Sequence, residues 1–298
     1  MLLGLVLLAA VAAPDAGRFY FSGDGTLRMH NAHFPETLEV RYRSADGDYD
    51  EAALAEIARF FRSRVDGRSG PMSLRLIELL DYVEDQYQPR QLILISGYRS
   101  PEFNQSLRSE GRRVAQASMH TEGMAADVQP VGVKLRRLWQ ALRKDEIGGV
   151  GLYQRDGFLH IDTGKPRFWE AATSKVEQNL SKENARLFAR TDFDRYDTLA
   201  GAVISLHSVT ALPIAIRREA RVGDATVALA PRGAGVRADG DCWVFEEPAD
   251  RYELAVTSPQ PAPAARTAIT LQTCAPRIGA TPERVLTNPV TRRGPGLR

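Results

Sequence analysis

The sequence lacks the excess of positive charge with which proteins neutralise the phosphates of nucleic acids. Its 39 Lys and Arg residues are balanced by 37 Asp and Glu residues, giving a formal net charge of +2, and no stripe of basic residues is interleaved with aromatic ones. No repeat of fixed period is present. The 298 residues, 43% of them hydrophobic, suffice for one large globular domain or two modest ones. We therefore predict a globular protein with no nucleic-acid partner.

Long hydrophobic runs are also scarce. One run, MLLGLVLLAAVAA, covers residues 1–13 and has no charge before Asp15. It is shorter than the roughly 20 residues of a transmembrane helix but typical of the apolar core of a secretory signal, and Ala10-Val11-Ala12 offers a cleavage site. Because no Lys or Arg precedes the run, an uncleaved anchor and a buried core segment remain alternatives.

Nothing after residue 13 resembles a membrane span. We predict a signal peptide over residues 1–13, export to the periplasm or cell envelope, and no stable membrane span once the signal is removed.

Cysteine is limited to Cys242 and Cys274. Two cysteines alone make a poor metal site, and both lie far along the chain from the His and Asp residues considered below. In an exported protein an even pair most simply forms a disulfide. The pair therefore also points to an oxidising compartment outside the cytoplasm.

The residue pattern changes near Trp169. Residues 19–170 combine a predicted hairpin, several stretches with apolar residues at helical spacing and short strands, which indicates a mixed α+β domain. Residues 171–199 are polar and helix-prone, and we predict a linker there. Short β-prone runs separated by Gly and Pro fill residues 200–277 and predict a small all-β module with a disulfide. The Pro- and Arg-rich residues 278–298 are predicted to form a flexible tail.

A candidate site begins in SMHTEGMAADV, residues 118–128, where Asp127 has apolar neighbours on both sides. A carboxylate in such a place is costly unless a salt bridge, backbone donors or a metal ion meets it. His120 lies in the same stretch. His160 lies on a predicted strand, where alternation puts its side chain on the same face as that of Asp162.

His120, Asp127 and His160 together supply two imidazoles and one carboxylate. That is the ligand number of a catalytic zinc site that keeps a fourth position for water. A structural His–Asp hydrogen bond beside an unrelated His fits the same spacing, so the spacing alone leaves both interpretations open.

Three strings carry a family resemblance: LISGYRS (94–100), SMHTEGMAADV (118–128) and GGVGLYQRDGFLHIDTGKPRFW (148–169). Over about residues 25–170 the chain resembles the YcbK-like murein endopeptidases, which belong to the zinc D-Ala-D-Ala peptidase and hedgehog-type fold group. The resemblance implies an antiparallel sheet with helices and zinc on His120, Asp127 and His160. It also implies that Arg99 lies near the substrate or the developing oxyanion, with a structural salt bridge as its alternative role.

The general base does not transfer from the resemblance. Related zinc D-Ala-D-Ala peptidases carry Glu or Asp three residues before the last His ligand, and here that position is Gly157. We take Asp162 as the preferred candidate, with orientation of a ligand as its alternative role. Asp156, which could equally be a turn residue, and Glu122 are the remaining candidates.

The predicted function is that of an exported zinc metallopeptidase which hydrolyses amide bonds in peptidoglycan peptide cross-links by metal-activated water. One alternative is a zinc D,D- or L,D-carboxypeptidase that acts on muropeptide stems. Because the usual base position is empty, a catalytically silent, metal-containing wall-binding protein is the other.

Overall fold

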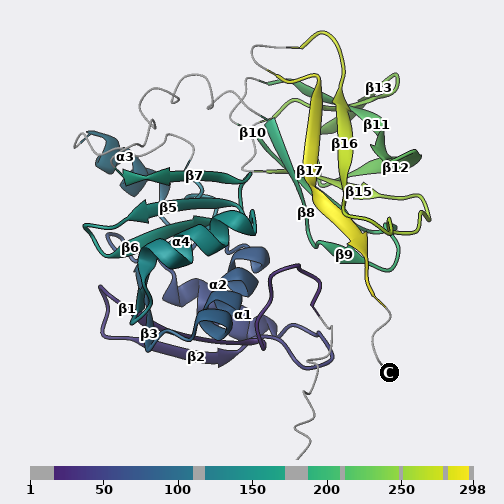
Figure 1. The fold of residues 1–298 in the computed structure, drawn as a ribbon. Coiled ribbons are helices and arrows are strands. Elements are labelled where there is room, and N and C mark those ends of the chain that lie inside the picture. The colour runs from purple at the N-terminus through teal and green to yellow at the C-terminus, as the bar shows by residue number, and fades with distance from the viewer. Residues whose placement is uncertain are drawn as a thin grey trace, which may run out of the picture.

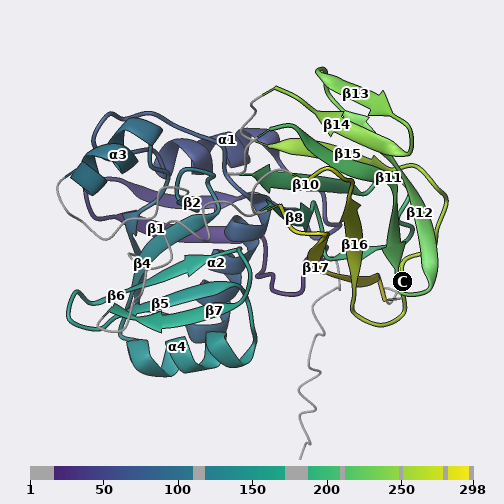
Figure 2. The same cartoon turned by 90° about the horizontal axis from the view of Figure 1, so that it is seen from above.

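The structure, a computed structural model, describes residues 17–109, 118–171, 187–208, 212–247, 251–277 and 281–294. These residues form two bodies that lie side by side, a sheet with helices and an all-β module (Figures 1 and 2). The predicted signal peptide lies outside the described residues, as do residues 172–186 of the predicted linker. No helix in the described part of the chain is long and apolar enough to cross a membrane.

A seven-stranded sheet builds the first body, in the order β2-β1-β3-β4-β6-β5-β7. Its strands are β1 (Thr26–Asn31), β2 (Thr37–Arg41), β3 (Gln91–Ser96), β4 (Ala125–Val131), β5 (Gly149–Tyr153), β6 (Phe158–Asp162) and β7 (Arg167–Glu170). The pairs β1–β3 and β5–β7 are parallel, so the prediction of an antiparallel sheet was wrong in this respect. A parallel neighbour needs a long connection, and β1 reaches β3 only after β2 and two helices.

Four helices accompany this sheet in the described part of the body. The helices are α1 (Glu51–Phe60), α2 (Leu74–Tyr87), α3 (Pro101–Ser109) and α4 (Leu135–Lys144), and α1, α2 and α4 contact β2, β1 and β5, respectively. Ala53, Ile57 and Phe60 of α1 are buried at helical spacing, and Asp50 caps that helix by accepting from the N–H groups of Ala52 and Ala53.

The apolar core fixes which face of the sheet the helices cover. Val150 and Leu152 of β5, together with Leu159 and Ile161 of β6, belong to one buried cluster with residues of α1, α2 and α4. Because side chains alternate along a strand, the intervening residues of β5 and β6 project from the opposite face. That opposite face carries the polar residues of the candidate site.

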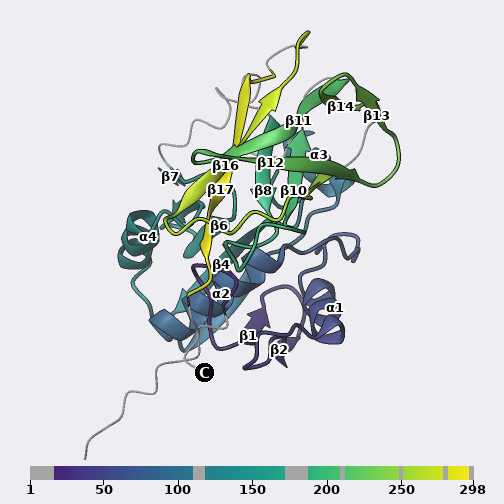
Figure 3. The ribbon, with the colours of Figure 1, turned by 90° about the vertical axis from the view of Figure 1, so that its right-hand side faces the viewer.

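The second body is an all-β module of ten strands. They are β8 (Leu187–Thr191), β9 (Arg195–Tyr196), β10 (Val203–Ser208), β11 (Ile214–Val222), β12 (Ala225–Arg232), β13 (Val236–Asp239), β14 (Cys242–Phe245), β15 (Tyr252–Val256), β16 (Thr267–Thr273) and β17 (Arg284–Arg292). The main order is β8-β10-β15-β12-β11-β16-β17-β9, and β14 pairs with both β11 and β13. The strands β11, β12 and β13 lie at the right of the module in Figure 1, the side that faces the viewer in Figure 3.

The module is larger than the predicted range 200–277. Strands β8 and β9 lie in the predicted linker, and β17 lies in the predicted flexible tail. The tail prediction rested on Pro and Arg content, but Val285 and Val290 of β17 are buried in the module core. Pro289 is tolerated because it pairs with Ala268 beside a register irregularity, where a strand can do without an N–H donor.

Cys242 and Cys274 form the predicted disulfide; they are 32 positions apart in the sequence, and their Cα atoms are 6.6 Å apart. Closing a loop of this length lowers the conformational entropy of the unfolded chain, which stabilises the folded state by about 3–4 kcal/mol. We expect reductant to lower the free energy of unfolding of the module by this order, measured by urea titration. In a Cys242→Ser/Cys274→Ser variant reductant should change nothing further, and a wild-type midpoint that is insensitive to reductant would contradict the prediction.

Contacts between the two bodies centre on the segment before β9. Asp194 accepts a hydrogen bond from the N–H of Tyr20 at 3.1 Å and forms an ion pair with Arg75 of α2. The rings of Phe19 and Phe193 lie 5.5 Å apart. The module is therefore fixed to the helix-covered body by both polar and apolar contacts.

Candidate metal centre

One row of residues crosses the first sheet on the face opposite the helices. Strand register pairs Ser96 with Asp127, Asp127 with His160, His160 with Gly151, and Gly151 with Trp169. Directly paired residues on neighbouring strands place their side chains next to each other. The sheet thus brings Asp127 and His160, 33 residues apart in sequence, into hydrogen-bonding contact.

His120 reaches this row from a turn that precedes β4. Gly123 closes that turn with φ +64°, and a Cβ atom there would lie 1.7 Å from the carbonyl oxygen of Pro71, so only glycine fits. The Nδ1 atom of His120 lies 2.8 Å from the carbonyl oxygen of Gly97. A carbonyl only accepts, so Nδ1 carries the proton and Nε2 has a free lone pair.

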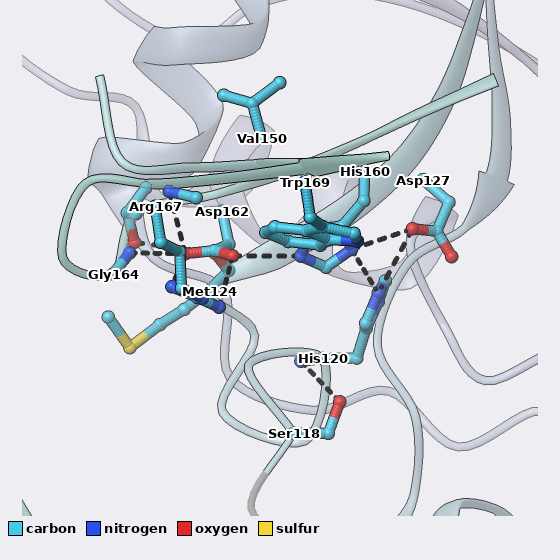
Figure 4. A network of polar contacts seen from close by, with 12 residues as sticks. Ser118, His120, Met124, Asp127, Val150, His160, Asp162, Gly164, Arg167 and Trp169 are labelled. Carbon is cyan, nitrogen blue, oxygen red and sulfur yellow. Dashed lines mark hydrogen bonds and ion pairs between the residues drawn. The ribbon is translucent and has the colours of Figure 1, made fainter. Parts of the chain in front are cut away.

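Three candidate ligand atoms converge beside the Asp127–His160 pair of this row (Figure 4). His120 Nε2 lies 3.2 Å from His160 Nδ1 and 3.4 Å from Asp127 Oδ1, and the last two atoms are 2.9 Å apart. Ligand atoms bonded to one tetrahedral zinc ion at about 2.0–2.1 Å are separated from each other by about 3.3 Å. The three separations therefore fit a single ion of this size with little rearrangement.

His160 is held from both sides. Its Nε2 atom lies 2.9 Å from Asp162 Oδ2, while its Nδ1 atom faces Asp127 and His120. A carboxylate accepts only, so Nε2 donates to Asp162, and Nδ1 can contact Asp127 Oδ1 at 2.9 Å only across a proton or a metal ion. This carboxylate–histidine arrangement is the one that orients histidine ligands of metal ions.

The charges of the three groups agree with this interpretation. Burial, with the nearby charge of Arg99, lowers the pKa of His120 to about 4, so His120 is neutral at neutral pH. Burial alone would raise the pKa of Asp127, but the hydrogen bond with His160 and the charge of Arg99 help to hold it well below its usual value. Burial alone would lower the pKa of His160, yet its hydrogen bonds to Asp127 and Asp162 raise it. The proton between His160 Nδ1 and Asp127 can therefore be replaced by a metal ion, because metal binding releases protons from its ligands.

Asp162 is fully buried on the side of His160 that faces away from Asp127. Its oxygens accept from Arg167 at 2.7 and 3.0 Å and from the N–H of Gly164 at 2.7 Å. The charges of Arg167 and His160 keep its pKa below the usual value although burial opposes this. The sequence-predicted base therefore lies next to a candidate ligand but not at the position where the three ligand atoms meet.

Arg99 contacts the second oxygen of Asp127. Its Nη2 atom donates to Asp127 Oδ2 at 2.8 Å, and its Nε atom donates to Ser96 Oγ at 3.1 Å. Arg99 thus forms a salt bridge that lies within the site itself. Both roles considered from the sequence, contact with the substrate or oxyanion and a structural salt bridge, stay compatible with this position.

Asp156 and Glu122 lie elsewhere. Asp156 is exposed in the turn between β5 and β6, and the strand step from His160 back to Phe158 alone spans about 7 Å. Gly157 closes that turn with φ +80°, which explains why this position carries no acid here. Glu122 Oε2 lies 3.4 Å from His207 Nδ1 of the module.

Sequence reasoning missed the two glycines that shape the site. A Cβ atom on Gly151 would lie 2.5 Å from the Trp169 ring, and one on Gly149 would lie 2.1 Å from Asp162 Oδ2. Because Gly151 has no side chain, the Trp169 ring can approach His160, with 5.3 Å between ring centroids. Because Gly149 has none, Arg167 can reach Asp162. Glycines at i and i+2 on one strand face were the available signal, since such glycines mark a close approach.

Comparison with known proteins finds relatives of the first body. The family model described as "Peptidoglycan L,D-endopeptidase MepK" matches residues 22–169. A protein of that name from Escherichia coli (strain K12) is 35% identical over 144 residues, which cover 48% of this chain and 79% of the relative. The "Probable peptidoglycan L,D-endopeptidase MepK" of Haemophilus influenzae is 29% identical over 146 residues, covering 48% and 78%. No solved structure matches the chain significantly. The region matched by the family model ends before the module begins.

Proposed function

Because the chain belongs to the family of the peptidoglycan L,D-endopeptidase MepK, we propose that it is an exported zinc endopeptidase that hydrolyses peptide cross-links of peptidoglycan. The observation that carries the proposal is the convergence of His120 Nε2, Asp127 Oδ1 and His160 Nδ1 within 3.4 Å of one another. Two imidazoles and one carboxylate are the ligand set of a hydrolytic zinc site, and a metal-dependent peptidase would use them to hold its ion.

When bound, zinc supplies Lewis acidity toward the scissile carbonyl and lowers the pKa of water. The protein side chains prepare its site. Asp162 fixes the ring of His160 through Nε2, the carbonyl of Gly97 fixes that of His120, and Arg99 fixes Asp127. In this proposal Asp162 and Arg99 act through the ligands, Asp156 has no part in the reaction, and the residue that takes the proton of water is not assigned.

Aromatic side chains line one side of the proposed site. The ring of Trp169 lies against His160, and its Nε1 atom donates to the hydroxyl of Tyr153 at 3.4 Å. Tyr153 in turn stacks on Phe158, with 4.5 Å between ring centroids. Such rings can pack along a peptide chain, so we assign them to the side of the site that contacts the substrate.

The proposed location is the periplasm or cell envelope. The apolar residues 1–13 support export, and the disulfide between Cys242 and Cys274 supports an oxidising compartment. The substrate assigned here also lies outside the cytoplasm.

Digestion of purified muropeptide dimers by the zinc-loaded protein tests the function. We expect dimers joined by an amide between an L- and a D-configured centre to be converted into monomeric stems, identified by mass spectrometry, and we expect no conversion after chelation. Release of a terminal residue from monomers would instead identify a carboxypeptidase. Binding to sacculi with an unchanged muropeptide profile would identify a silent wall-binding protein.

A further inference from the structure

Strands β8 and β10 of the module present one face to the candidate metal centre. Leu187, Ala189 and Thr191 of β8 are buried in the module, so alternation directs Phe188 and Arg190 outward. On β10 the ring of His207 stacks on that of Phe188, with 4.9 Å between centroids. Figures 1 and 2 place β8 and β10 on the side of the module next to the first body.

This face touches the loop that carries His120. His207 Nδ1 lies 3.4 Å from Oε2 of Glu122, two residues after the candidate ligand. Arg190 shares the face with Phe188 and interacts electrostatically with both Asp162 and Arg167. The module therefore lies beside the metal centre on the side where Asp162 supports His160.

Among the described residues, the charged groups around Arg190 do not balance. Asp162 is bound by Arg167, with both oxygens engaged, and Asp194 is bound by Arg75. Arg190 interacts with all four of these groups at longer range, yet among the described residues no carboxylate lies within ion-pair distance of it. Its Nη2 atom is buried without a hydrogen-bond partner. Three guanidinium groups thus share two carboxylates, and the surplus charge is that of Arg190.

A buried cation without a partner is unfavourable by several kcal/mol relative to a paired one. Burial lowers the pKa of Arg190 to about 9, which still leaves it charged at neutral pH. An arginine in such a place is completed by a planar anion, since its donors match a carboxylate in bidentate geometry. The side chain of Arg167, which binds Asp162, is 41% exposed, so solvent reaches one edge of this cluster.

We propose that Arg190 of the module binds a carboxylate of the peptide substrate beside the metal centre, so that the module selects substrates with a free carboxylate near the scissile amide. This inference rests on the proposed function. It assigns the module a specificity role in the site, in a part of the chain that the matched family region does not include.

The test compares cross-linked muropeptide dimers that carry free carboxylates with the same dimers after conversion of those carboxylates to amides. Wild-type protein should cleave the free form more efficiently. Arg190→Gln should lower kcat/KM on the free form by roughly 10- to 100-fold, the loss typical of charge-assisted hydrogen bonds, and leave kcat/KM on the amidated form unchanged. Arg190→Lys should restore part of the preference.

Matched controls separate recognition from folding. Arg221→Gln removes an exposed arginine of β11 and should leave the preference intact. Zinc content should be the same in all variants, and Arg190→Gln should unfold at the wild-type temperature or above it, because it removes a buried charge without a partner. Equal cleavage of both substrate forms by the wild type would overturn the inference, as would an equal loss on both forms in Arg190→Gln.

Equilibrium binding of free and amidated stem peptides, measured by calorimetry, keeps the two proposals distinct. If no dimer is cleaved but the wild type binds the free stem more tightly and Arg190→Gln does not, the endopeptidase function fails and the carboxylate site stands. If cleavage occurs without any preference in rate or binding, the endopeptidase function stands and the role of Arg190 is refuted.

Discussion

Replacing His120 with alanine should abolish stoichiometric zinc binding. Among the described residues, His120 supplies one of the three ligand atoms that converge at the centre, and its Nε2 atom lies within 3.4 Å of the other two. The remaining pair, Asp127 and His160, would keep their mutual contact but could not complete a three-ligand site. We expect the zinc affinity to fall by more than the roughly 10- to 100-fold that loss of an outer partner costs, and peptidase activity to fall to background.

Elemental analysis after dialysis measures the zinc content directly. His30→Ala is the matched control, since His30 lies on β1, outside the three-residue cluster, and its Nδ1 atom lies 3.3 Å from the hydroxyl of Thr37. That variant should retain one zinc per chain. Full zinc occupancy in His120→Ala would refute the ligand assignment.

Replacing Asp162 with asparagine should weaken zinc binding and leave catalysis largely recoverable. The carboxylate contacts His160 Nε2 and Arg167 rather than the point where the ligand atoms meet, so its loss should act through the orientation of His160. We expect the zinc dissociation constant to rise by roughly 10- to 100-fold. At saturating zinc most of the turnover should return, measured on muropeptide dimers.

The same variant tests the role that the sequence favoured for Asp162. A general base contributes about 10²–10⁴-fold to a rate, and that loss would persist at saturating zinc with an unchanged dissociation constant. Such a result would restore Asp162 as the base and remove its orienting role. Asp156→Asn is the control, because Asp156 is exposed in the β5–β6 turn, and it should leave both zinc affinity and turnover unchanged.

Local pattern was sufficient for several elements and failed for others. The helical spacing of Ala53, Ile57 and Phe60 predicted α1, and their burial agrees. The β-prone runs predicted an all-β module, but composition hid β17, where Pro and Arg accompany the buried Val285 and Val290. A strand that is completed by pairing with distant strands carries little local signal, because its stability comes from that pairing.

The sequence by itself named the three residues of the candidate centre. The spacing of His120 and Asp127, the strand alternation of His160 and Asp162, and the family motifs around them nominated the same ligand set that converges in the structure. These features are local, since alternation and a tight glycine turn depend only on the chain within a few residues.

Only the tertiary structure decided what each polar group does beside the centre. Register between β4, β5, β6 and β7 directs Asp162 toward Nε2 of His160 and Asp127 toward Nδ1, and the glycines of β5 leave room for Arg167 and Trp169. Packing of the module brings Arg190 into the field of Asp162, although 28 positions separate the two in the sequence numbering. Register and domain packing arise from contacts between segments far apart in the chain, which no local periodicity encodes.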